Sequence, residues 1–293
     1  MLMLGGRELD IDVVIIDEAQ DLSTAQWRFI EQTFRKAKRM YIGGDDDQAI
    51  FEWSGADVNY FINLKGEKTV LSQSYRIPKS IHDLSQTITD KIKHRTHKPY
   101  HSKKEQGEVD YWMSLDDIDM SSGSWLLLAR NSYLLGELAA STKAKGFNYM
   151  IKGKPSISTS DINAIKLWEK CRKGYKPIAQ DLEKLAEYTT LTKYDTIWHD
   201  AFNKIDVERI EYFKSLNRRG ESLLKPRINI STIHGSKGGE ADHVALTTDM
   251  AYSTWDATNL NMDAEHRVWF VGATRAKQSL HIVQPRGRYY YDI

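Results

Sequence analysis

The stretch that decides the fold is Val13-Val14-Ile15-Ile16-Asp17-Glu18-Ala19-Gln20-Asp21. Its four β-branched apolar residues predict a buried strand over 13–17, and two acids follow where that strand ends. Open α/β sheets bind ligands at the carboxyl ends of their strands, which makes Asp17 and Glu18 candidate site residues. This position suits Asp17 to hold Mg²⁺ through water, and Glu18 to orient or deprotonate a water molecule. The alternative is a solvated turn whose acids cap the helix that follows Ser23.

Outward from this stretch, apolar runs alternate with helical patterns, which predicts an α/β fold with mostly parallel sheets. The expected strands are 13–17, 39–43, 69–71, 108–113, 124–129, 147–151, 227–232, 243–247 and 279–283. The expected helices are 23–38, capped by Ser23 or Thr24, and 57–64, 78–93, 133–145 and 262–275. Residues 155–225 combine helical patterns with many charges and no strong strand, so we interpret them as an all-helical insertion or the remnant of one.

The composition is that of a globular protein with one large or two smaller domains: 293 residues, 41% hydrophobic and 28% charged. A formal net charge of +1 does not indicate a nucleic-acid partner, so any such surface must be local. The single Cys171 cannot form an intramolecular disulfide, which suits a reducing cytoplasm, where we expect the protein. Because no apolar run reaches the roughly 18 residues of a membrane span, we expect no membrane partner.

Four further motifs follow the opening stretch in order. They are Gly44-Asp45-Asp46-Asp47-Gln48-Ala49-Ile50-Phe51-Glu52-Trp53-Ser54-Gly55-Ala56, Tyr75-Arg76, His234-Gly235-Ser236-Lys237-Gly238-Gly239-Glu240 and Val271-Gly272-Ala273-Thr274-Arg275-Ala276-Lys277. Together and in this order, they resemble the motor motifs of superfamily 1 helicases of the UvrD/Rep type, over nearly the whole chain. Gln20 directly after Ala19 is the UvrD/Rep spelling. Ser54 and Gly239 depart from the arginine and leucine that the family usually has there.

The resemblance implies RecA-like P-loop NTPase motor domains with accessory insertions. On that template, residues 1–104 are a partial first motor domain, and 105–154 with 227–293 are a nearly complete second one. Residues 155–226 are then a reduced helical insertion. The resemblance also implies ATP and Mg²⁺ as cofactors, single-stranded DNA as partner, and movement in the 3′ to 5′ direction.

The resemblance assigns roles around the nucleotide. Asp17 is the metal position, Glu18 holds the hydrolytic water, and Gln48 senses the γ-phosphate. Arg76 and Arg275 are two arginine fingers, whose planar guanidinium groups suit phosphate charge. The other ATP-binding positions are Gln20, Tyr75, Lys237, Gly238 and Glu240, with the tyrosine stacking on adenine. A polar turn residue is the alternative for Gln48, and an interdomain salt bridge is the alternative for Arg76.

Aromatic and polar residues are the candidates for DNA contact. Phe51 and Trp53 are separated by one residue, so on an extended segment both would face one side and could stack on bases. The alternative is that one or both belong to the core. The resemblance adds Thr232, His234 and, as a weaker candidate, Asn131. The basic residues of 91–104 form either a phosphate-tracking patch or a solvated connector.

One motif of such motors is not in this sequence: nothing reads G-x-x-x-x-G-K-[ST], and Gly5-Gly6-Arg7 lacks both the spacing and the lysine. We therefore expect a carboxy-terminal portion of a helicase that does not turn over ATP by itself, with an exposed sheet edge and its arginine fingers held apart. Two alternatives stay open. One is a DNA-gripping module without hydrolysis, and the other is a subunit whose phosphate loop comes from another polypeptide.

Overall fold

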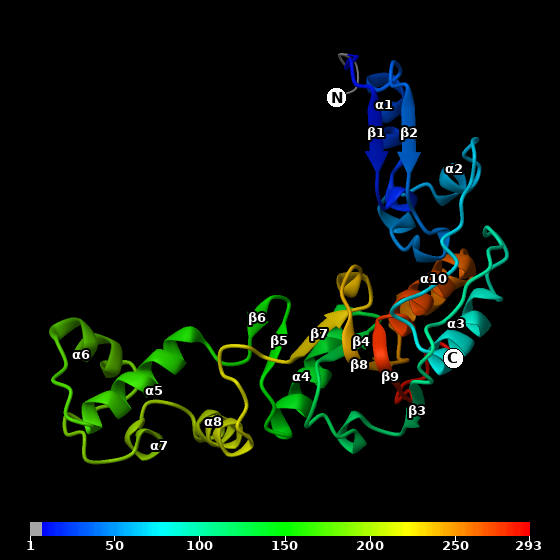
Figure 1. Ribbon diagram of the computed structural model, residues 1–293. Helices are drawn as coiled ribbons and strands as arrows, with labels where there is room; N and C mark the ends of the chain where they lie inside the picture. Colours follow the sequence, from blue (N-terminus) through cyan, green and yellow to red (C-terminus); the bar gives the residue numbers. More distant parts are fainter. Residues whose placement is uncertain (1–7) are drawn as a thin grey trace.

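The computed structural model describes residues 8–293, whose strands form two separate sheets (Figure 1). Gly5-Gly6-Arg7, compared above with a phosphate loop, lies outside the described residues. The first sheet pairs β1 (Val13–Ile16) in parallel with β2 (Arg39–Ile42). α1 (Thr24–Thr33) lies between these strands in sequence and packs on them, and α2 (Val58–Ile62) follows β2.

The start of α1 follows from its sequence. The Ser23 hydroxyl accepts a hydrogen bond from the backbone N–H of Gln26, whose side chain reaches back to the backbone of Ser23, which completes a capping box. Trp27 and Ile30 then pack with Ala19 in a small core. The acids that follow β1 are thereby held between a strand and a capped helix.

Two expectations about the first sheet are wrong. β1 is not buried on both faces, because Val14 is 7% exposed whereas Ile15 is 77% exposed. Alternate residues of a strand face opposite sides, so only the α1 side of β1 is covered. Residues 69–71 form no strand, and no strand among residues 8–293 pairs with them. They lie in a loop, where Leu71 is 88% exposed.

The second sheet has seven strands in the order β3-β9-β8-β4-β7-β5-β6, parallel except for the β5–β6 pair. The strands are β3 (Glu108–Trp112), β4 (Trp125–Ala129), β5 (Tyr149–Ile151), β6 (Lys154–Pro155), β7 (Ile228–Thr232), β8 (Ala241–Thr247) and β9 (Ala276–Val283). Every residue of the central strand β4 is buried, as its unbroken apolar run predicts for a parallel sheet with both faces covered.

Helices cover the two faces of the second sheet. α3 (Lys79–Thr89) and α10 (Met262–Ala273) pack on one face, and α4 (Leu135–Ala144) packs on the other. Ile81 and Ile88 of α3 belong to the core of the second sheet. By this packing α3 is part of the second sheet's unit, whereas the boundary predicted at residue 104 assigns it to the first motor domain. α9 (Tyr252–Thr258) was not expected from the sequence.

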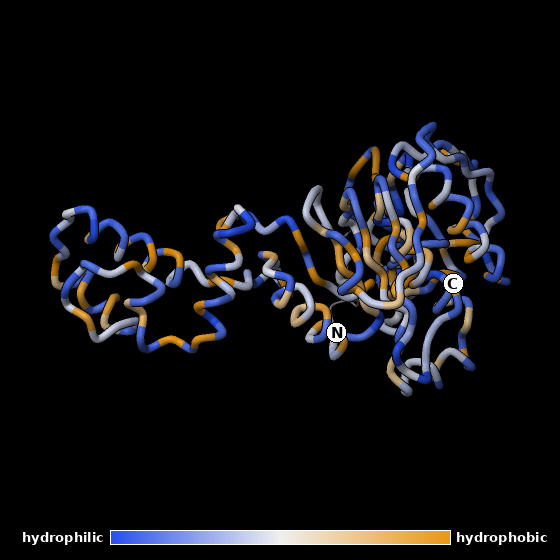
Figure 2. The backbone as a smooth tube through the Cα atoms, turned by 90° about the horizontal axis from the view of Figure 1, so that it is seen from below, coloured by the Kyte–Doolittle hydropathy of each residue, from blue (hydrophilic) through white to orange (hydrophobic). Residues whose placement is uncertain are grey.

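The insertion is helical, as predicted, and extends from the second sheet as an arm (Figure 1). It contains α5 (Thr159–Arg172), α6 (Ala179–Ala186), α7 (Trp198–Ala201) and α8 (Val207–Arg219). The arm has its own apolar core around Trp168 and Phe202, separate from the hydrophobic strands of the sheet (Figure 2). None of the helices described in 8–293 has the length and hydrophobicity needed to cross a membrane.

Candidate nucleotide and DNA site

The acid pair lies directly after β1 and is exposed to solvent. Asp17 accepts the backbone N–H of Glu18 through Oδ1 at 2.9 Å. Glu18 has a left-handed backbone, with φ of 51°, a conformation that costs a non-glycine residue about 1–2 kcal/mol. Gln20 is fully buried; it donates to Glu18 Oε2 at 2.6 Å and accepts from the N–H of Asp45 at 3.0 Å. Gln20 therefore fixes the Glu18 carboxylate relative to the turn that follows β2.

Gln48 and Arg275 meet across the two sheets. Arg275 follows α10, is 2% exposed, and donates from Nη2 to Gln48 Oε1 at 3.1 Å. Its Nε donates to the carbonyl of Val271 at 2.9 Å, which holds the guanidinium against its own helix. Burial, followed by the nearby positive charge of Arg76, lowers the pKa of Arg275 to about 10. The group is thus still charged at neutral pH.

The other predicted arginine, Arg76, is paired with an acid of the second sheet. Its Nε donates to Glu240 Oε2 at 2.6 Å, and Lys277 lies 3.2 Å from Glu240 Oε1. The hydrogen bonds from Lys277 and Arg76 lower the pKa of the Glu240 carboxyl. Tyr75 is 90% exposed, so its ring is accessible for stacking against a ligand.

Lys237 reaches from the second sheet into the acids of the first. Its Nζ donates to the Asp21 carboxylate and, at 2.8 Å, to the carbonyl of Gln48, and it lies 3.5 Å from Glu18 Oε2. The left-handed Gly238, with φ of 80°, follows it in the loop. The two sides of the site are therefore already in contact, and the expectation that the arginines stay apart is wrong. The contacts of Lys237 with Asp21 and of Arg275 with Gln48 hold the two sheets together.

The predicted DNA-facing aromatic residues lie in a turn, not on an extended segment. Glu52–Ser54 form a 3₁₀ helix, which separates the two rings. Phe51 packs against the core of the second sheet, whereas Trp53 is 76% exposed. His234 lies between them, with ring centroids 6.1 Å from Phe51 and 6.3 Å from Trp53. Trp53 is thus the more exposed of the two rings.

Thr232 and Asn131, the two polar candidates for DNA contact besides His234, differ in how far their side chains are engaged by other residues. Thr232 lines an open cavity of about 350 Å³ together with Ser132 and Lys152, and its hydroxyl accepts the N–H of Gly235 at 3.0 Å. Both ends of the Asn131 amide are engaged within the protein. Its oxygen accepts the N–H of Ala251 and its nitrogen donates to the Thr254 hydroxyl, each at 2.8 Å. In this structure Asn131 anchors the start of α9.

Sequence reasoning missed several residues that build the site. Asp21 and Asp45 contact the predicted residues directly, and Lys98 contacts Asp45. Lys98 and Arg95 also correct the idea of a phosphate-tracking patch, because both side chains turn inward to aspartates. Asp45 stands in a quoted motif, so its position gave a signal. Lys98 stands in the basic segment 91–104, but its local sequence did not indicate the aspartates, which lie some fifty residues earlier in the chain.

A mixed α/β fold dominated by a parallel sheet, with acids after β1 and arginines from two segments, fits a RecA-like helicase. Two family models match the chain: the UvrD/REP helicase N-terminal domain over 6–69 and the UvrD-like helicase C-terminal domain over 172–286. The chain belongs to the UvrD/Rep-type superfamily 1 helicases.

Individual relatives agree with this family. A probable DNA helicase II homolog of Mycoplasma capricolum is 30% identical over 102 residues, 33% of this chain and 14% of that protein. The ATP-dependent DNA helicase PcrA of Leuconostoc citreum is 26% identical over 123 residues, 40% of this chain and 16% of that protein. The matched segments thus span a small part of these relatives. A solved structure titled "The structure of PRRSV helicase" covers 94% of this chain and 35% of that one, at 13% identity and a TM-score of 0.36.

Proposed function

We propose that the chain carries the motor machinery of an ATP-driven translocase on single-stranded DNA. The observation that carries the proposal is the 3.1 Å contact between Arg275 and Gln48. It brings the arginine that follows α10 to the turn after β2, which Gln20 links to the Glu18 carboxylate. Phosphoryl transfer depends on positioning and charge stabilisation, and charged groups that two sheets bring together are suited to both.

The acids that follow β1 suit a hydrated magnesium ion. Asp17 is exposed, and within residues 8–293 one of its oxygens accepts a hydrogen bond, from the N–H of Glu18. Mg²⁺ is commonly bound through one or two carboxylates plus substrate phosphates, which fits this arrangement. When bound, the ion neutralises phosphate charge. Glu18, oriented by Gln20, would then hold the attacking water and accept its proton.

The cationic side would bind the phosphates, and Tyr75 would stack on the base. Arg76 and Arg275 supply fixed positive charge where negative charge moves during transfer. Arg76 must exchange Glu240 for a phosphate oxygen to do so, since the two are paired here. Glu240 is then free to accept from the ribose, in line with the family role of its position.

The candidate DNA-binding residues would hold a single DNA strand by base stacking and by polar contact. The exposed Trp53 would be the base platform, and Thr232 would face the DNA backbone from the open cavity that it lines. By family analogy the movement is 3′ to 5′ and the protein works in the cytoplasm. A module that grips DNA without hydrolysis is the second candidate, because the printed sequence has no G-x-x-x-x-G-K-[ST] loop. The third is a loop supplied by another polypeptide; within residues 8–293 the first sheet has two strands, at whose edge a further strand could pair.

DNA binding is tested by anisotropy of a labelled single strand. Replacing Trp53 with alanine should weaken binding by about 1–3 kcal/mol, the range for one stacked base, and affinity should fall with salt. Tyr111→Ala is the matched control, because this exposed aromatic lies on β3. Equal affinity of wild type and Trp53→Ala would remove Trp53 from the DNA site.

Hydrolysis is tested in two steps. We expect the 293-residue chain alone to release no DNA-stimulated phosphate, because nothing in its sequence matches the loop that anchors a triphosphate. Joined to the phosphate-loop segment of a UvrD/Rep relative, it should do so, and Glu18→Gln should abolish turnover while nucleotide binding survives. Turnover close to wild type in the Glu18→Gln protein would refute its role as base. Arg275→Ala serves as the control for contaminating activity.

A further inference from the structure

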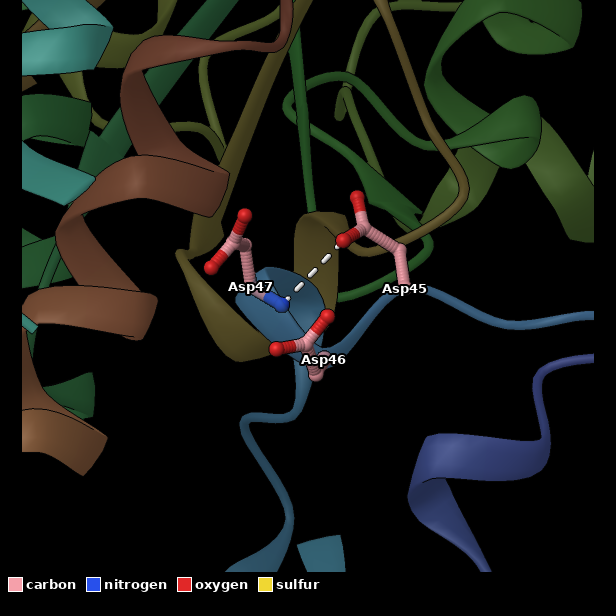
Figure 3. A group of neighbouring side chains, drawn as sticks. All are labelled: Asp45, Asp46 and Asp47. Carbon is pink, nitrogen blue, oxygen red and sulfur yellow. Dashed lines mark hydrogen bonds between the residues drawn. The ribbon is translucent and has the colours of Figure 1, made fainter. Parts of the chain in front are cut away.

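Three consecutive aspartates occupy the turn after β2 (Figure 3). Oxygens of Asp45, Asp46 and Asp47 lie within 4.8 Å of one another, and the last two residues are buried. Buried carboxylates this close repel one another and lose hydration, so they need cationic partners. The structure supplies these partners from the protein itself.

The partners come from the connector that follows α3. The Lys98 ammonium contacts Asp45 and lies 2.8 Å from Asp46 and 3.1 Å from Asp47. Arg95 forms two hydrogen bonds to Asp47, at 2.7 and 2.5 Å. Lys98 thus stands at the centre of the acidic cluster, where it contacts all three carboxylates, whereas Arg95 contacts Asp47 alone.

Lys98 acts on Gln48 through Asp45. One oxygen of Asp45 contacts Lys98, and the other accepts from Gln48 Nε2 at 2.8 Å. An ionised carboxylate can only accept, so the amide nitrogen of Gln48 must face Asp45. The amide oxygen is thereby turned toward Arg275, whose Nη2 donates to it at 3.1 Å. Each hydrogen bond in this chain fixes the direction of the next.

The same connector is attached to α10, the helix that delivers Arg275. The carboxylate of Asp263 accepts the backbone N–H groups of Lys93 and His94, at 3.1 and 2.8 Å. Arg267 donates to the carbonyl of His94 from the body of the helix. The connector therefore holds both ends of the Gln48–Arg275 contact, one through Asp45 and the other through α10.

We propose that Lys98 is a positioning residue: it holds Asp45 so that the Gln48 amide presents its nitrogen to Asp45 and its oxygen to Arg275. The inference rests on the proposed function, in which Gln48 is the γ-phosphate sensor. Arg95 bonds the carboxylate of Asp47, whose backbone N–H donates to Asp45 Oδ1 at 3.1 Å, so its contact with Asp45 is one residue less direct than that of Lys98. The two cations of one connector thus have different duties, which makes them a matched pair for experiment.

The test compares Lys98→Met with Arg95→Met in the full chain. Both variants remove one cation from the aspartate turn, and thermal unfolding checks that each remains folded. The readout is the side-chain amide of Gln48 in a protein labelled with ¹⁵N-glutamine, assigned by its loss in Gln48→Glu. Lys98→Gln, which keeps a neutral donor, is made alongside in case the methionine variant unfolds.

In the Lys98 variants we expect the two amide protons of Gln48 to move toward the shifts of a free glutamine. Their exchange with water should rise on the order of tenfold, as expected when a hydrogen bond to an ionised group is lost. Arg95→Met should leave both unchanged. The proposal would be overturned if the Lys98 and Arg95 variants changed the Gln48 amide signals equally, or if no variant changed them. Because this readout needs neither ATP nor DNA, its failure is distinct from the failure of the proposed function.

Discussion

Acidification should destabilise this protein through His234. Burial, then the charges of Arg130 and Lys237, lower the pKa of His234 from 6.5 to about 4. Its folded pKa is lowered, so below pH 6.5 the unfolded chain takes up a proton that the folded chain refuses. The stabilisation is complete above pH 6.5 and is lost as pH falls toward 4. Since one pKa unit corresponds to about 1.36 kcal/mol, a fall from pH 7 to 4.5 should cost about 2–3 kcal/mol.

The assay is the free energy of urea unfolding at pH 7 and pH 4.5, for wild type and His234→Gln. Burial also lowers the pKa values of His243, His266 and His281, so acid weakens both proteins through these groups, and the difference between them isolates His234. The histidine ring resonance of wild type gives the pKa directly. An equal loss of stability in the two proteins, or a ring that titrates near 6.5, would refute the reasoning.

Two further predictions concern the first sheet. A β-carbon at Gly44 would lie 2.6 Å from Gln20 Oε1 and 2.7 Å from the ring of Phe61. Gly44→Ala should therefore lower the free energy of unfolding by about 1–3 kcal/mol. An unchanged urea midpoint would contradict this close approach. Val14→Ala should destabilise by about 1 kcal/mol or more, because the side chain is 7% exposed, whereas Ile15→Ala should stay within about 0.5 kcal/mol at 77% exposed. Equal costs in the same unfolding assay would mean that the second face of β1 is covered.

The strands and the order of the site residues could be predicted because their signals are local. β4 is an unbroken apolar run, and the acids stand directly after β1, so periodicity and position were sufficient. The reading failed where tertiary contact decides. Residues 69–71 have a strand-like composition, but no neighbouring strand among the described residues pairs with them. The Phe51–Trp53 segment turns because Gly55 adopts φ of 98° and closes a 3₁₀ helix.

The roles of Lys98 and Lys237 could not be predicted for a related reason. A lysine in a basic connector has the same local sequence whether it faces solvent, a phosphate or a buried aspartate. Only the fold decides among these, by placing Lys98 beside the aspartate turn and Lys237 beside Asp21. The resemblance to a family named Lys237 as a nucleotide position, but it carried no information about the acid that the lysine contacts here.

These acid contacts define what ATP binding has to displace in the proposed function. Arg76 is paired with Glu240, Lys237 with Asp21, and Arg275 with Gln48. In the proposed function, a triphosphate does not meet free cations; its oxygens replace partners that the protein already provides. A multiply charged phosphate bound by arginine in two parallel hydrogen bonds can win that exchange. The exchanges at Lys237 and Arg275 release an acid and an amide that join the two sheets, so in the proposed function nucleotide binding and the contact between the sheets are coupled by these side chains.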